Sequence, residues 1–234
     1  MLTQEEIESN KERYIELIKG ITRENSDIDR FLRWIEKSDF FSAPASTKFH
    51  AHYDGGLCQH SLNVYDNLVK LVDTFASHIE YEEVEDKDTG EITVKENKIH
   101  DISEDSIRIV SLLHDLAKVN FYESYMRNVN TGETDPKTGR TIWTQVKDYK
   151  IRPAQDRFVL GSHEQISEYM ARTFFPLTVD ESAAILNHHG GKGFDSAQTD
   201  LAPIYNRFTL ALLLHMSDMI STYVSEKIEE DTDE

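Results

Sequence analysis

The stretch Leu112-Leu113-His114-Asp115-Leu116-Ala117-Lys118 places a histidine and a carboxylate side by side in an apolar segment. Both side chains cost free energy to bury unless a partner compensates them. A divalent metal ion is such a partner, because imidazole and carboxylate are both ligands of first-row transition metals. Helical spacing also brings Lys118 near His114 and Asp115, since residues three and four apart share a helix face. The stretch therefore predicts a metal site carried by a buried helix.

Further candidate ligands flank this stretch at wide spacing along the chain. They are His60, His163, His188, His189 and Asp218. Asp218 lies within another apolar segment, where an unpaired charge would be costly. The carboxylate of Asp115 has two oxygens and can bridge two ions, as in two-metal sites. Because several imidazoles are expected as ligands, Mn, Fe, Co or Ni is favoured over Mg.

Length and charge limit the fold and the partners. The 234 residues suffice for one compact domain, and no linker or internal repeat divides residues 1–234. The formal net charge of −18 repels polyanions at long range, so binding to duplex DNA is not expected. A small phosphorylated ligand remains compatible with this charge, because bound metal ions reverse the sign of the local field.

Cysteine usage and hydropathy predict a cytoplasmic protein. Cys58 is the single cysteine, so no intramolecular disulfide can form, which suits a reducing compartment. The first residues lack a basic region followed by an apolar run, so no signal peptide is expected. No apolar stretch approaches the roughly 20 residues that a membrane-spanning helix needs. We therefore expect no membrane partner.

Apolar periodicity predicts a mostly α fold. A helical N-terminal extension covers about residues 1–40, and a long helix then begins with His60 near its start. A later helix carries the His114-Asp115 pair, and three more helices follow. One of these opens with a capping box at residues 178–181. The predicted architecture is a single helical bundle.

Two insertions interrupt the helical pattern. Residues 80–100 carry a turn signal at Asp88-Thr89-Gly90 and predict an exposed hairpin. Residues 120–153 contain turns followed by strand-forming side chains, which predict a second hairpin, either a lid over the metal site or a surface feature. The fold class is therefore a mostly α bundle with one or two inserted β-hairpins. The acidic residues 226–234 are expected to form a disordered tail.

The order of these residues along the chain is H, then HD, then H, then HH, then D. This order resembles that of the HD superfamily of metal-dependent phosphohydrolases, over roughly His60 to Asp218. The segment Gly55-Gly56-Leu57-Cys58-Gln59-His60-Ser61-Leu62 looks like the opening motif of that family. The likeness is greatest to small HD hydrolases of bacteria and their phages, and to the catalytic part of HD-type 3′-to-5′ exoribonucleases.

The resemblance implies an all-helical core and a role for each candidate ligand. One metal would be held by His60, His114, Asp115 and Asp218, and a second by His163, His188 and the bridging Asp115. Lys118 matches the lysine of the family's HD-x-x-K motif, which contacts the scissile phosphate. The doublet His188-His189 departs from relatives with one histidine there. We expect His188 to be the ligand, and His189 to be either a second ligand or a phosphate contact.

The implied function is hydrolysis of a phosphoester or phosphoanhydride bond of a nucleotide by a metal-activated water. Catalysis is assigned to Asp115 and Lys118, and substrate contacts to Lys118, His50, Arg152, Lys192 and Trp143. Alternatives are a 3′-to-5′ exonuclease on short single-stranded RNA or DNA, a cyclic mono- or dinucleotide phosphodiesterase, and a catalytically silent nucleotide sensor. HD-type exoribonucleases carry an OB-fold domain ahead of the HD domain, which the helical first forty residues do not supply. Self-association is also compatible with the sequence.

Overall fold

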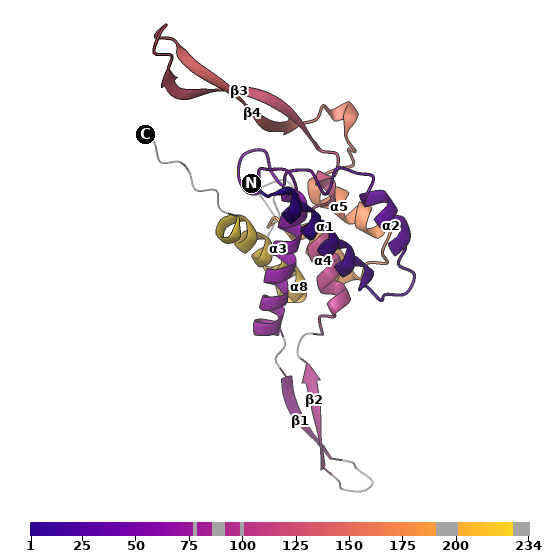
Figure 1. The fold of residues 1–234 in the computed structure, drawn as a ribbon. Helices are drawn as coiled ribbons and strands as arrows, with labels where there is room; N and C mark the ends of the chain where they lie inside the picture. The colour runs from indigo at the N-terminus through magenta and orange to yellow at the C-terminus, as the bar shows by residue number, and fades with distance from the viewer. Residues whose placement is uncertain (77–78, 86–91, 99–100, 191–200, 227–234) are drawn as a thin grey trace.

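The computed structural model describes residues 1–76, 79–85, 92–98, 101–190 and 201–226, which form a helical body with two β-hairpins (Figure 1). Its described helices are α1 (Gln4–Lys19), α2 (Ile28–Ile35), α3 (Gly56–Leu71), α4 (Glu104–Leu113), α5 (His163–Arg172), α6 (Val179–Asn187), α7 (Ala202–Arg207) and α8 (Thr209–Ile220). The prediction of a mostly α fold is confirmed. No helix among the described residues is long and apolar enough to cross a membrane.

Local sequence signals account for several helix boundaries. Thr178 and Glu181 form the predicted capping box at the start of α6, each side chain binding the other residue's backbone N–H. The Ser103 hydroxyl accepts a hydrogen bond from the Ser106 backbone and caps α4. These short-range bonds place both helix starts without help from distant residues.

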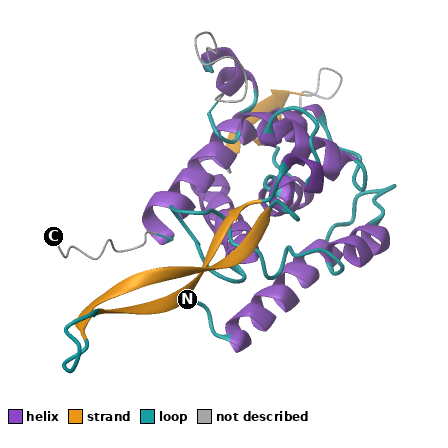
Figure 2. Ribbon diagram, turned by 90° about the horizontal axis from the view of Figure 1, so that it is seen from above, coloured by secondary structure: helices purple, strands orange, loops and turns teal. Residues whose placement is uncertain are grey.

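The core lies around α3, which packs against both α4 and α8, while α6 packs against α8. Seen from above, the helices gather into one body from which a hairpin extends (Figure 2). Helix α1 covers α3 and α4 from outside. Its fully buried Tyr14 donates a hydrogen bond of 2.9 Å to the carbonyl of Leu112, near the C-terminus of α4. The N-terminal extension is therefore helical, as predicted, and it supports the end of α4 from which the His114-Asp115 pair follows.

The two hairpins extend from opposite ends of the helical body (Figure 1). In the first, β1 (Ile79–Glu85) pairs with β2 (Ile92–Lys98), and in the second, β3 (Tyr122–Thr134) pairs with β4 (Thr141–Ile151). Most residues of β3 and β4 are exposed. The second hairpin therefore projects as a surface feature, the alternative to the lid over the metal site.

The sequence prediction of a continuous helix through His114 and Asp115 is wrong in one respect. Helix α4 ends at Leu113, with His114 as its C-terminal cap. Asp115 has φ −109° and ψ 19°, and a short 3-10 helix follows at Leu116–Lys118. The end of α4 lets His114 and Asp115 turn toward the same centre instead of diverging by about 100° around a helix.

A second correction concerns the acidic tail. Residues 227–234 lie outside the described part of the chain, but Glu226 does not belong to a disordered segment. It follows a π-helical turn at Ser221–Ser225, is buried, and binds two residues of α3. Because most of residues 226–234 are acidic, the sequence did not distinguish Glu226 from the residues that follow it.

Candidate metal centre

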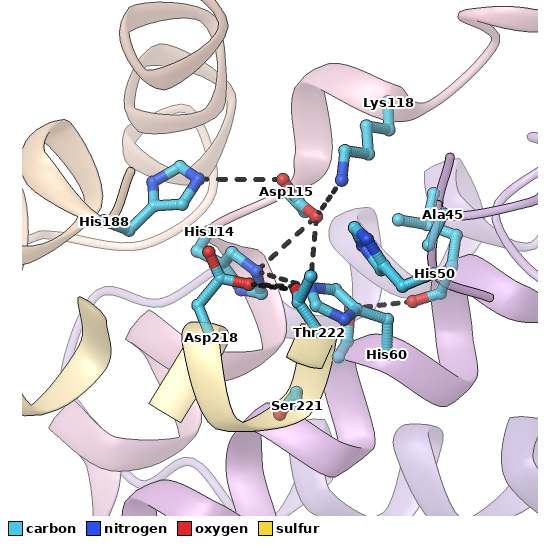
Figure 3. A network of polar contacts seen from close by, with 12 residues as sticks. Ala45, His50, His60, His114, Asp115, Lys118, His188, Asp218, Ser221 and Thr222 are labelled. Carbon is cyan, nitrogen blue, oxygen red and sulfur yellow. Dashed lines mark hydrogen bonds and ion pairs between the residues drawn. The ribbon is translucent and has the colours of Figure 1, made fainter. Parts of the chain in front are cut away.

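Seven side chains that lie far apart in the sequence meet inside the helical body. His60 comes from α3, His114 and Asp115 from the end of α4, His163 from the start of α5, His188 and His189 from the end of α6, and Asp218 from α8. Asp115 lies in the middle, with His188 on one side and Lys118 on the other (Figure 3). All seven residues predicted as metal ligands are thus brought together.

One group of ligand atoms is formed by His60, His114 and Asp218. Nε2 of His60 lies 3.2 Å from Oδ1 of Asp218 and 3.4 Å from Nε2 of His114. Both of these Nε2 atoms lie 3.5 Å from Oδ2 of Asp115. Ligands roughly 2.1 Å from one ion at angles of 90–110° are about 3.0–3.4 Å apart, so this spacing fits a shared metal ion.

A second group is formed by Asp115, His163, His188 and His189. Oδ1 of Asp115 lies 2.6 Å from Nε2 of His163 and 3.7 Å from Nε2 of His188. Nε2 of His188 is buried and has no hydrogen-bond partner among the described residues. A buried nitrogen without a hydrogen-bond partner beside a carboxylate is available to bind a metal ion. Asp115 therefore directs one oxygen toward each group.

The imidazole rings are oriented by hydrogen bonds at their other nitrogen. Nδ1 of His114 donates to the Ser111 carbonyl at 2.8 Å, and Nδ1 of His188 donates to the Ile185 carbonyl at 2.7 Å. Both histidines cap helix C-termini, where carbonyls three residues back lack helical partners. With the proton on Nδ1, the lone pair of Nε2 faces the centre, which is the usual arrangement of metal-ligating histidine.

Glu226 provides the corresponding partner for His60. Its carboxylate accepts a hydrogen bond of 3.0 Å from Nδ1 of His60 and one of 2.7 Å from the Asn63 amide. Sequence reasoning missed this residue because a run of acidic side chains gives no reason to single one out. The wider π-helical turn before it, closed by a bond from the Glu226 N–H to the Ser221 carbonyl, breaks the 3.6-residue period that would have predicted its face.

His189 is held by a second glutamate that the sequence did not single out. Its Nδ1 lies 2.8 Å from Oε1 of Glu164, which is buried. Burial would raise the pKa of Glu164, but the hydrogen bond with His189 outweighs it and lowers this pKa to about 2. Nε2 of His189 lies 4.0 Å from Oδ2 of Asp218, so the ring faces both groups of ligands.

Buried charge at the centre is predominantly negative. Burial would raise the pKa of Asp115, but the charge of Lys118 and the hydrogen bond from His163 outweigh it and hold this pKa well below its usual range. Burial would likewise raise the pKa of Asp218, but its bond to His60 lowers it. Asp115, Asp218 and Glu226 are all buried, and such charges are stable only when paired.

The histidines respond to this field according to their neighbours. Burial would lower the pKa of His60, but Glu226 and Asp218 raise it to about 10. Burial dominates at His114 and lowers its pKa to about 3, which keeps that ring neutral. A neutral imidazole is the form that binds a metal. The carboxylates that favour a proton on His60 would also favour a metal cation that replaces this proton.

Lys118 is buried beside the centre, and its Nζ lies 2.7 Å from Oδ2 of Asp115. Burial would lower the pKa of Lys118, but the charge of Asp115 raises it, so the side chain is a fixed cation. The spacing of three residues that predicted this contact is preserved even though the backbone there is a 3-10 turn.

The other predicted substrate contacts are placed differently. His50 packs on His60 with ring centroids 4.8 Å apart, and neither of its buried ring nitrogens has a hydrogen-bond partner among the described residues. Arg152 lies at the base of the second hairpin, where it binds the Tyr122 carbonyl. Trp143 is exposed on β4, away from the centre, and Lys192 lies outside the described residues.

A cavity of about 470 Å³ opens beside the metal centre. Its lining residues come from the loop before α3, the end of the α4 segment, the end of α6, and the α8 region; they are Phe49, His50, Lys118, His189, Gly190, Leu201, His215, Asp218, Met219, Thr222 and Tyr223. Arg152 lines a separate, more polar cavity at the base of the second hairpin. A ligand in the first cavity would reach Lys118, His50 and the centre together.

Comparisons of the chain with protein families, curated proteins and solved structures found no match.

Proposed function

We propose that this protein is a metal-dependent phosphohydrolase that cleaves a phosphoester or phosphoanhydride bond of a nucleotide. The observation that supports it best is the arrangement around Asp115. One carboxylate oxygen faces His60 and His114, and the other faces His163 and His188. A carboxylate shared by two groups of imidazoles is the ligand set of a two-metal site.

The histidines of the centre fit Mn, Fe, Co or Ni better than Mg, which prefers oxygen ligands and water. Two ions bound there would polarise phosphoryl oxygens and lower the pKa of a bound water toward neutrality. His60, His114 and Asp218 would hold one ion, His163 and His188 the other, and Asp115 both. His189 would complete the second group from its position on Glu164.

Lys118 is the protein cation that would act on the substrate. Its ammonium group is buried, charged and at the edge of the cavity. A fixed positive charge at that place offsets negative charge that develops on a phosphoryl group during hydrolysis. In the free protein this charge is balanced by Asp115 at 2.7 Å, so the lysine is already oriented before a substrate arrives.

The test is an activity screen with the metal-loaded protein. Purified protein with Mn²⁺ would be incubated with deoxynucleoside triphosphates, nucleoside monophosphates, cyclic mono- and dinucleotides, and short single-stranded RNA and DNA. We expect turnover of one small-nucleotide class. Asp115→Ala should abolish turnover and reduce bound metal, measured by plasma mass spectrometry, while circular dichroism shows a folded helical protein.

Lys118→Ala separates metal binding from the action on phosphate. It should lower turnover strongly while the metal content remains that of the unsubstituted protein. Lys137→Ala, in the turn of the exposed second hairpin, is the matched control and should change neither. Full turnover by Asp115→Ala would contradict the two-metal proposal. Metal binding without turnover of any substrate would favour a sensor, and cleavage of oligonucleotides alone would favour an exonuclease.

A further inference from the structure

The lining of the cavity beside the metal centre has two chemically different parts. Lys118, Asp218 and His189 belong to the centre or contact it. Phe49, Leu201, Met219 and Tyr223 form an apolar part, the apolar end, where Phe49, Met219 and Tyr223 are exposed while Lys118 and Asp218 are buried. A ligand that fills the cavity must therefore carry a charged group and an apolar body.

Large apolar side chains are unusually exposed at the apolar end. Phe49 is 76% exposed, Tyr223 is 69% exposed and Met219 is 46% exposed. Such side chains gathered around a hollow mark a binding surface more often than an unused one. The two aromatic rings come from distant segments, the loop before α3 and the π-helical turn after α8.

Both aromatic residues are tied to the metal centre by short segments. His50 follows Phe49 directly and packs on the His60 ring. Tyr223 belongs to the turn that continues α8 beyond Asp218 and precedes Glu226, the partner of His60. A base that stacks on Phe49 or Tyr223 would therefore lie near a phosphoryl group bound at the centre.

His50 also lines the cavity, and its ring nitrogens are free to form hydrogen bonds with a ligand. Its Nδ1 and Nε2 are both buried without a partner among the described residues, although its side chain lines the cavity. A buried unpaired polar group costs free energy that a ligand's polar atom would recover. The ligand is therefore expected to carry hydroxyl or similar groups in addition to its charged group and its apolar body.

We propose that the cavity binds a single nucleoside monophosphate, with its base against Phe49 and Tyr223 and its sugar beside His50. The assignment rests on the proposed phosphohydrolase function, whose centre would take the phosphate. A base offers flat aromatic surface for the rings, and stacking on such rings tolerates every base. An inorganic phosphate or sugar phosphate would leave the apolar end unfilled.

Size and charge favour one nucleotide over a polymer. The volume of about 470 Å³ falls within the range of roughly 300–1,000 Å³ typical of pockets for small organic ligands. Among the described residues that line the cavity, Lys118 is the only lysine or arginine. A nucleic-acid strand needs a continuous basic groove along its backbone, which this lining does not provide.

The experiment compares two ring-removing variants with a matched control. Phe49→Ala and Tyr223→Ala would be assayed with Mn²⁺ against AMP, GMP, CMP, UMP and ribose 5-phosphate. Each should raise KM for the nucleotides roughly 5- to 100-fold, the range for losing one base–aromatic stack, with kcat nearly unchanged. Phe75→Ala removes a ring that is 62% exposed outside the cavity and should change neither constant.

A binding measurement makes the result independent of turnover. In the Asp115→Ala protein, saturation-transfer NMR should show contact from protein to the base protons of AMP, and this signal should fall when Phe49→Ala or Tyr223→Ala is added. An unchanged KM and unchanged NMR signal in both ring variants would overturn the proposal. So would hydrolysis of ribose 5-phosphate, or of a lysophospholipid, as efficient as that of AMP.

The two proposals can fail separately. Base contact by NMR without hydrolysis of any phosphate ester would support the base subsite and contradict the phosphohydrolase. Hydrolysis of nucleotides at the same rate in all ring variants would support the phosphohydrolase and contradict the base subsite.

Discussion

At the scale of single residues, the orientation of the metal ligands depends on hydrogen bonds made away from the centre. His114 and His188 use backbone carbonyls of their own helices, which any sequence supplies at a helix C-terminus. His60 and His189 lie elsewhere and need side-chain partners, Glu226 and Glu164. Substituting the partner side chain can therefore change the orientation of His60 and His189, but the backbone partners of His114 and His188 are kept in any such variant.

Replacing Glu226 should weaken metal binding without unfolding the protein. Glu226→Ala removes the acceptor at Nδ1 of His60, so the ring loses its orientation and part of its basicity. Loss of such a partner typically costs about 10–100-fold in metal affinity. Competition with a chromogenic chelator would measure the Kd for Mn²⁺.

Two further variants test that this effect comes from the hydrogen bond. Glu226→Gln keeps an acceptor oxygen without the charge and should fall between the unsubstituted protein and Glu226→Ala. Glu133→Ala, on the exposed hairpin, should leave the Kd unchanged. Equal metal affinity in Glu226→Ala and the unsubstituted protein would show that His60 is oriented by its packing alone.

The Tyr14 hydroxyl should contribute to stability through one buried bond. Tyr14→Phe keeps the ring but leaves the Leu112 carbonyl, next to the end of α4, without its donor. An unsatisfied buried carbonyl costs about 1–3 kcal/mol, which urea unfolding would detect. Tyr169→Phe, whose ring is half exposed, serves as the control. A free energy of unfolding that is equal in both variants would indicate that solvent reaches the Leu112 carbonyl.

At the scale of elements, the ends of three helices contribute to the centre, while His60 and Asp218 come from within α3 and α8. Helix α4 and α6 each deliver a histidine at the C-terminal cap, and α5 delivers His163 as its first residue. Helix C-termini carry partial negative charge and favour a cation nearby. Two such ends at one centre add to the negative field of the carboxylates.

The junction between the Phe49 loop and α3 depends on a close backbone contact at Gly56. A Cβ added to Gly56 would lie 2.1 Å from the Ala51 carbonyl oxygen, so the loop must move in Gly56→Ala. We expect a loss of about 1–3 kcal/mol from overpacking. His50 would also be displaced from His60, and a higher KM for the nucleotide substrate would report this.

The control for this prediction is Gly132→Ala in the second hairpin. Gly132 has φ +77°, but a Cβ there would meet no atom within 4 Å. This variant should show a modest loss of stability from backbone strain and an unchanged KM. A KM that is unchanged in Gly56→Ala as well would mean that the loop position does not affect the cavity.

At the scale of the whole molecule, the proposed metal binding should be linked to stability. Among the described residues, the three buried carboxylates of Asp115, Asp218 and Glu226 are balanced by Lys118, beside Asp115, and by His60, whose pKa burial would lower but Glu226 and Asp218 raise to about 10. Folding of this chain gathers those charges, so an ion that binds only the folded state must stabilise it. The net charge of −18 adds repulsion that bound divalent cations also reduce.

Removing metal should therefore lower the melting temperature. At a free Mn²⁺ concentration 100 times the Kd, binding contributes about 2.7 kcal/mol. For a chain of this size that corresponds to a Tm difference of roughly 5–11 °C between Mn²⁺ and EDTA in differential scanning fluorimetry. Asp115→Ala should show no such difference. An equal response in that variant would place the stabilising ion elsewhere.

The sequence by itself determined the helical class and the identity of the predicted ligands. Helical periodicity and capping signals such as Thr178 with Glu181 are local, because they involve residues three or four apart. His114 and Asp115 were recognisable because buried polar residues in an apolar frame need a partner. The remaining histidines were identified because their order along the chain resembles that of a known family, and their local sequence surroundings did not single them out.

Only the tertiary structure decided how these residues meet. Glu226 and Glu164 acquire their roles from side chains 166 and 25 residues away, and no local pattern encodes such contacts. Arg152 and Trp143 were predicted beside the substrate, but Trp143 lies on a hairpin that extends away from the body, and Arg152 lines a separate cavity at its base. Local hydrogen bonding and periodicity fix elements, whereas the packing of α3, α4, α6 and α8 fixes which side chains share a centre.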